Sequence, residues 1–178
     1  MFTDEFKVQN GELQGDTVEE TVVGDLSAVK KEVDLIPPSK NVLMRIKSAS
    51  VKENADKTFR QINLQLVIVE GIQVGETLKY MGKPMFQTVC YYADPNKYTK
   101  EYFQKKQHLV QLKMLCNALG EDLKSVTIND AMLTGIVGKE VLATIKQSKK
   151  KDWTNKQSEL VVGEMQNEVV DFKKAELI

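Results

Sequence analysis

The sequence is poor in the residues that most enzymes and metal sites require. It has one histidine and two cysteines, Cys90 and Cys116, so no Cys/His zinc set can be assembled. His108 has no cysteine, serine or carboxylate beside it at a spacing that suggests catalysis. The segment Gly135–Lys139 lacks the residues that would complete a phosphate-binding loop. The sequence therefore predicts no enzyme, no metal site and no cofactor.

Long apolar runs and an excess of charge of either sign are also missing. No run approaches the ~20 apolar residues that span a bilayer, so we expect no membrane partner. Two cysteines give no sign of an oxidising compartment, and we expect a cytoplasmic protein. The 25 basic and 25 acidic residues cancel, which by itself argues against a partner with many negative charges.

The charges are nevertheless distributed unevenly along the chain. Residues 1–36 carry a net charge of −6, residues 37–160 carry +8, and residues 161–178 carry −2. A basic body between acidic ends is typical of a protein with a polyanionic partner, although a solvated mixed surface has the same composition. Pro37 and Pro38 cannot continue a helix. We therefore expect an acidic arm at 1–36, a folded domain at 37–165 and a C-terminal extension at 166–178.

Alternating apolar residues predict strands on both sides of a helical segment. The first strand begins at Asn41, and the second, with the clearest alternation, spans Phe59–Val69. A third strand is predicted at Glu76–Tyr92 and is interrupted at Gly82 and Pro84. Two later strands are predicted around residues 141–145 and 160–162, and a further extended piece is predicted to include Val169, Val170 and Phe172.

The helical segment is predicted from apolar residues that recur at helical spacing. One amphipathic helix is expected from about residue 97 to 119, with Gly120 at its C-cap position. A shorter helix is expected at Asn129–Ile136.

Three strands, a helical insert and two strands predict a mainly β fold. Three consecutive antiparallel strands and a following hairpin can close into a five-stranded OB-like barrel, a fold whose strand surface and loops bind oligonucleotides or oligosaccharides. Here those loops are Lys52–Thr58 and Ser148–Gln157. The alternative with the same element order is an α+β roll or a half-open sheet with one packed helix.

Binding residues are predicted where lysines and aromatic rings occur together, because single-strand binders neutralise phosphates and stack on bases. Lys149–Trp153 combines both and contains the only tryptophan. Lys79–Phe86 is a second mixture, on a strand where aromatic residues also commonly face a core. The predicted nucleic-acid-binding residues are Arg45, Lys47, Arg60, Lys79, Tyr80, Lys83, Phe86, Tyr92, Lys149, Lys150, Lys151, Trp153 and Lys156.

The turns and strand openings resemble those of a phage protein family. The segments that carry the resemblance are Ile36–Pro38, Val69–Gly71, Gly75–Leu78, Leu115–Gly120 and Val137–Val141. Across residues 36–165 the chain resembles small proteins of phage replication and recombination gene clusters, which are regarded as OB-fold single-stranded-DNA-binding proteins. The resemblance implies an action in the cytoplasm of an infected bacterium, and it assigns no contact residues.

The leading prediction is a non-enzymatic protein that binds single-stranded DNA without sequence preference in phage replication or recombination. The sequence does not distinguish RNA from DNA as the ligand, and it is compatible with an oligomeric protein. The acidic ends are expected to solubilise the protein, to compete with nucleic acid for a basic groove, or to dock phage or host replication and recombination proteins. The alternatives are a phage interaction module, either an inhibitor or an assembly factor, that acts through the acidic arm, and a β-rich virion component.

Overall fold

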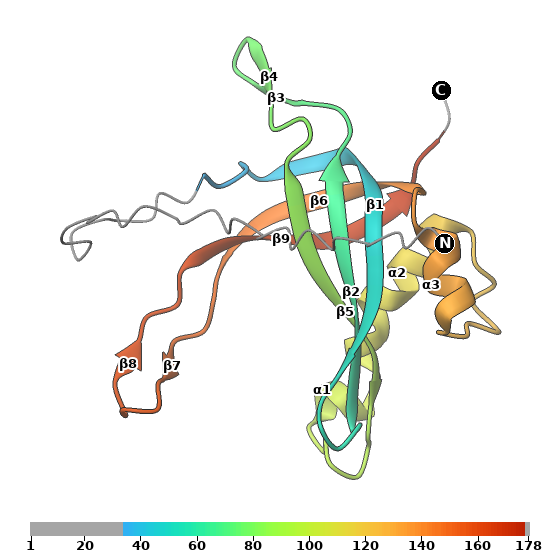
Figure 1. Ribbon diagram of the computed structural model, residues 1–178, viewed down its shortest axis with the longest axis vertical. Helices are drawn as coiled ribbons and strands as arrows, with labels where there is room; N and C mark the ends of the chain where they lie inside the picture. The colour runs from blue at the N-terminus through green and yellow to red at the C-terminus, as the bar shows by residue number, and fades with distance from the viewer. Residues whose placement is uncertain (1–33, 177–178) are drawn as a thin grey trace, which may run out of the picture. The chain divides into compact units, whose positions relative to one another are not determined.

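A five-stranded antiparallel sheet forms the centre of the part of the chain that the computed structural model describes, residues 34–176. Its strands lie in the order β5-β2-β1-β6-β9 (Figure 1). They are β1 (Ser39–Glu53), β2 (Phe59–Ile68), β5 (Pro84–Ala93), β6 (Glu140–Lys149) and β9 (Met165–Lys174). Two hairpins are separate from the sheet: β3 (Ile72–Val74) with β4 (Thr77–Lys79), and β7 (Trp153–Thr154) with β8 (Leu160–Val161). The predicted mainly β class is confirmed.

The helical residues form an insert between β5 and β6. Its elements are α1 (Glu101–Gln104), the 3-10 turn η1 (Gln107–Leu109), α2 (Val110–Leu119) and α3 (Asp130–Ile136). Helix α2 packs against β9, β5 and β6, and α3 packs against β1. Within residues 34–176, none of these helices has the length and apolar character needed to cross a membrane.

The core lies against the face of the sheet to which the alternating apolar residues point. In β2, every second residue from Ile62 to Ile68 is at most 1% exposed, as the alternation in the sequence predicts. The equivalent positions of β1 and β6 are buried as well, and helical residues such as Leu115 and Ile136 complete the core. The other face of β1, β2 and β5 is therefore left for polar side chains, and we call it the outer face.

The edge strands β5 and β9 are connected by side-chain amides and not by a backbone ladder. Val169 donates its backbone N–H to Gln87 Oε1 at 3.1 Å, and its carbonyl oxygen accepts from Gln111 Nε2 at 3.3 Å. Gln87 Nε2 donates to Gln111 Oε1 at 3.2 Å. Gln87 is only 8% exposed, so these bonds satisfy a buried polar group that would otherwise destabilise the fold. Because β5 and β9 are not paired by backbone hydrogen bonds, no closed barrel is found among the described residues.

The first described residues are held to the domain by specific contacts. Ile36 is fully buried, its N–H donates to Asn167 Oδ1 at 2.8 Å, and its carbonyl accepts from Asn167 Nδ2 and Gln147 Nε2. Burying such a side chain contributes about 1.5–3 kcal/mol to folding. The domain therefore begins before the predicted boundary at residue 36. Of the predicted acidic arm, residues 1–33 lie outside the described residues.

The single helix predicted from 97 to 119 is wrong. Lys106 adopts a left-handed conformation with φ 56°, which separates α1 from η1 and α2. Before this break, the rings of Tyr98 and Phe103 pack against Phe59 of β2, with centroid distances of 5.3 and 6.4 Å. Tertiary packing of aromatic side chains has overridden the helical periodicity. Gly120 (φ 77°) does end α2, as predicted.

Two of the predicted strands also differ from those in the structure. The strand expected at Glu76–Tyr92 is divided, because Tyr80 and Gly82 have positive φ values and turn the chain between β4 and β5. Leu160 belongs to the small β7–β8 hairpin, and the last strand of the sheet is β9. The predicted extension at 166–178 is therefore largely a sheet strand that pairs with β6.

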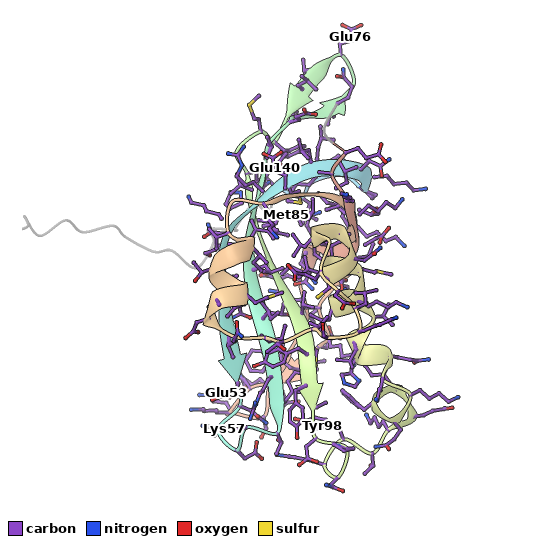
Figure 2. The ribbon with its side chains drawn as sticks, turned by 90° about the vertical axis from the view of Figure 1, so that its right-hand side faces the viewer. Glu53, Lys57, Glu76, Met85, Tyr98 and Glu140 are labelled. Carbon is purple, nitrogen blue, oxygen red and sulfur yellow. The ribbon has the colours of Figure 1, made fainter. Side chains whose placement is uncertain are left out.

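The two hairpins project from different places on the sheet. Glu76 lies at the tip of the β3–β4 hairpin, beyond one end of the sheet, whereas Glu53, Lys57 and Tyr98 lie near the other end (Figure 2). The β7–β8 hairpin extends sideways from β6 and β9 (Figure 1). Residues predicted on the two hairpins therefore do not meet.

Candidate functional site

The outer face of β1, β2 and β5 forms the floor of a hollow of about 550 Å³, which we call the polar groove. Two cross-strand rows make up this floor: Ser48, Gln65 and Phe86, and next to it Ser50, Asn63 and Thr88. Opposite side chains in such rows lie about 4.5–5.5 Å apart at their Cβ atoms, which gives a continuous surface. Residues 166–168 of β9 form the facing wall.

The polar groove is nearly neutral. Among the residues that line it, Lys52 and Glu168 are the charged ones, and the others offer mainly hydroxyls and amides. Asn63 Oδ1 is buried and has no hydrogen-bond partner within residues 34–176. Since buried polar atoms are nearly always satisfied, this acceptor is an exception in the floor of the groove. The groove can therefore bind polar, uncharged groups.

Phe86 is the predicted site residue that the structure places in the polar groove. Its side chain is 73% exposed, on the outer face between Thr88 and the turn that precedes β5. An exposed phenylalanine forgoes the roughly 1.5–3 kcal/mol that its burial would contribute. Its ring offers a flat apolar surface at the edge of a polar floor.

The β7–β8 hairpin gathers several other predicted residues. Trp153 is 58% exposed and pairs with Val161 across the hairpin. The remaining predicted residues of this region are Lys149, Lys150, Lys151 and Lys156, all exposed. The hairpin segment thus combines these four lysines and an exposed indole with three acidic residues, Asp152, Glu159 and Glu164.

The base of this hairpin is fixed by hydrogen bonds. Lys150 N donates to the carbonyl of Glu164 at 3.0 Å, and Gly163 N donates to Asp152 Oδ1 at 2.8 Å. Asp152 also forms an ion pair with Lys149 at 3.3 Å, so part of the positive charge is compensated. The strand that follows the hairpin begins with the residues that form the wall of the polar groove. Hairpin and groove are therefore connected directly through β9.

Arg45, Lys83 and Tyr80 form contacts within the domain that lie away from the groove. Arg45 Nη2 lies 2.6 Å from Glu140 Oε1, and Lys83 Nζ lies 2.9 Å from Asp34 Oδ2. The Tyr80 ring is half-buried, with Lys83 Nζ 4.9 Å from its centroid. The Arg45 pair connects β1 to β6, whereas the Lys83 and Tyr80 contacts hold the turn before β5 to the chain before β1, and none of the three residues lines the polar groove.

The other predicted residues are dispersed. The Arg60 guanidinium carbon lies 5.2 Å from the centroid of Tyr92, which is 40% exposed, so these two form a cation–π pair at the far end of β2. Lys47 lies at the bulge of β1 beside Ser48, and Lys79 lies on the separate β3–β4 hairpin. The predicted residues therefore do not form one continuous basic groove.

The β1–β2 loop, expected to contribute to binding, is ordered by its own side chains. Asp56 accepts hydrogen bonds from Thr58 and forms an ion pair with Lys97. Hydrogen bonds from Lys97 and, to a smaller extent, from Thr58 lower the pKa of Asp56 from 3.8 to about 2. This carboxylate is thus charged at neutral pH and compensates one lysine near the end of the sheet.

Sequence reasoning missed the wall that β9 contributes to the groove. Residues 166–168 were placed in an extension, although the apolar residues Val169 and Phe172 just after them signalled another strand of the sheet. Ser50 and Thr88 were not singled out, because the sequence does not distinguish a polar residue that binds a ligand on an outward strand face from one that contacts only water.

No group of three or more histidine, cysteine, aspartate or glutamate residues within 34–176 is arranged to hold a metal ion. No known protein-family model matches the sequence, and no curated protein matches it significantly. The resemblance to phage single-strand-binding proteins therefore stays a prediction.

Proposed function

We propose that this protein binds single-stranded nucleic acid, with DNA as the expected ligand, without sequence preference and without catalysing a reaction. The bases lie in the polar groove and against exposed rings, and the phosphates lie along the lysines of the β7–β8 hairpin. The observation that carries the proposal is the exposed Trp153, next to Lys149–Lys151 on a hairpin whose chain continues directly into the groove wall. In line with the resemblance, the setting is phage replication or recombination in the cytoplasm of an infected bacterium.

The proposal includes an OB-like arrangement of the sheet. The order β5-β2-β1-β6-β9 is that of a five-stranded barrel opened between β5 and β9, and the Gln87–Gln111–Val169 hydrogen bonds connect these two edges. In an OB-fold, the face of strands 2 and 3 and the loops between strands 1 and 2 and between strands 4 and 5 form the binding surface. On this proposal, the polar groove and the β7–β8 hairpin correspond to that strand face and to the loop between strands 4 and 5.

The chemistry of the two surfaces supports the proposal that the hairpin binds the phosphates and the polar groove binds the bases. Lysines that contact phosphates release condensed counterions, which gives affinity that falls steeply with salt. A neutral floor of amides and hydroxyls suits the edges of unpaired bases, which carry both donors and acceptors. Each base that stacks on an aromatic ring adds about 1–3 kcal/mol of binding free energy. A duplex would bind poorly, since its bases are stacked and paired.

A titration with oligodeoxythymidylate tests the proposal. We expect quenching of Trp153 fluorescence together with a rise in the anisotropy of a labelled oligonucleotide, and an affinity that decreases with added salt. Duplex DNA of the same length serves as the matched competitor and should compete weakly. Absence of oligonucleotide binding at low salt would refute the proposal. Binding without quenching would remove Trp153 from the interface.

The interaction-module alternative depends on the acidic arm, of which residues 1–33 lie outside the described residues. It predicts that oligonucleotides do not bind even at low salt, so the same titration separates it from nucleic-acid binding.

A further inference from the structure

The polar groove adjoins a second hollow of about 370 Å³. Gln87, Thr88 and Glu168 line both hollows, so the two are neighbours along β5. Beyond Thr88, the floor continues with Gln61 of β2 and Cys90 of β5, which pair across the strands. From Phe86 to Cys90 the two hollows follow β5 for about 14 Å, at about 3.4 Å per residue.

The far wall of the second hollow comes from the helical insert and not from the sheet. Tyr102 of α1 is 50% exposed, and Val110 at the start of α2 is 46% exposed. Gln107 and His108 of η1 lie between them in the sequence and complete this wall. The aromatic ring of Tyr102 is therefore available at the end of the two hollows opposite to Phe86.

The lining of the second hollow excludes phosphate as its ligand. It contains no lysine or arginine, and its one carboxylate, Glu168, would repel an anion. Burial lowers the pKa of His108, so its imidazole is neutral at pH 7. Burial likewise raises the pKa of the Cys90 thiol, which stays protonated. The second hollow thus suits an uncharged polar group.

His108 supplies an independent observation. Its Nδ1 atom is buried and has no hydrogen-bond partner within residues 34–176, as is true of Asn63 Oδ1 in the first hollow. Each hollow is therefore lined by a residue with a buried polar atom that has no hydrogen-bond partner within the described residues. Because buried polar atoms are nearly always satisfied, both atoms are exceptions at the proposed site.

We propose that the second hollow binds one unpaired base at an end of the strand that occupies the polar groove, with the base stacked on Tyr102 and its edge facing the amides of Gln61 and Gln107. The inference rests on the proposed function and extends its site to the helical insert. Removing the aromatic ring on which a base stacks costs about 1–3 kcal/mol of binding free energy, which corresponds to roughly a 5- to 150-fold change in affinity.

Abasic oligonucleotides test this inference, because they keep the phosphate and lack the base. The probes are an oligodeoxythymidylate of about eight nucleotides, within the site sizes known for such folds, and two versions with an abasic residue at the 5′ or the 3′ end. With the wild-type protein, we expect one of the two abasic probes to bind about tenfold more weakly than the intact one. With Tyr102→Ala, the intact probe and that abasic probe should bind equally.

Two further variants separate stacking from folding. Tyr102→Phe keeps the ring and should retain the difference between probes, while Gln107→Ala, at an exposed residue, should reduce this difference with an unchanged melting temperature. Equal binding of all three probes by the wild-type protein would overturn the inference and leave the proposed function intact. No binding of the intact probe would overturn the proposed function itself.

Discussion

The β7–β8 hairpin and the polar groove differ in what they offer to a ligand. The hairpin segment presents four lysines, three acidic residues and an exposed indole on a narrow projection. The groove presents hydroxyls and amides around a defined hollow and is nearly neutral. A ligand that uses both must carry charge along one side and uncharged polar groups along the other. A single strand of nucleic acid has this distribution, because its phosphates and its bases point in different directions.

The largest loss of oligonucleotide affinity is expected when the lysine charges of the hairpin are removed. The triple variant K149Q/K150Q/K151Q should lose about two units of salt slope, at roughly 0.7 per phosphate contact of a single strand, and about 100-fold in affinity at low salt. The measurement is the oligonucleotide affinity as a function of salt concentration.

The matched control for this variant removes three lysines from the helical insert. K100Q/K113Q/K124Q changes the net charge by the same amount at exposed positions that line neither hollow. It should alter the salt slope much less. An equal loss in both triple variants would mean that net charge, and not the hairpin, determines the affinity.

A smaller effect is expected from removing the ring in the groove. Phe86→Ala should weaken binding by about tenfold through lost stacking, while leaving the salt slope unchanged because no charge is removed. Leu78→Ala is the control, since Leu78 is 65% exposed on the separate β3–β4 hairpin. A parallel loss of affinity and salt slope in Phe86→Ala would show that groove and hairpin do not act on different parts of the ligand.

The strands could be predicted where local alternation and tertiary burial agree. Ile62 and Ile68 alternate with polar residues and are buried as expected, and Asn129 caps α3 through its side chain at 2.9 Å from Met132 N. The prediction failed where distant contacts decide the local conformation. Packing of Phe103 against Phe59 shortens the predicted helix, and pairing with β6 converts the predicted extension into β9.

The site was predictable in its composition and not in its geometry. The mixture of lysines and Trp153 was visible in the sequence, but the exposure of Trp153 depends on a hairpin that leaves the sheet. In the sequence, Lys83 and Arg45 were as plausible as Lys150 as phosphate-binding residues. In the structure, each of the two is paired with the carboxylate of a residue distant in the chain. The helical wall with Tyr102 could not be found because the helix itself was predicted with the wrong shape.

Photo-crosslinking with an oligonucleotide that carries 5-iododeoxyuridine at successive positions tests the separation of bases and phosphates most directly. Because the reactive group is on the base, the account predicts covalent adducts at Phe86 and Trp153, and no adducts with duplex DNA. Adducts confined to the β3–β4 hairpin, or the same adducts from duplex DNA, would contradict it.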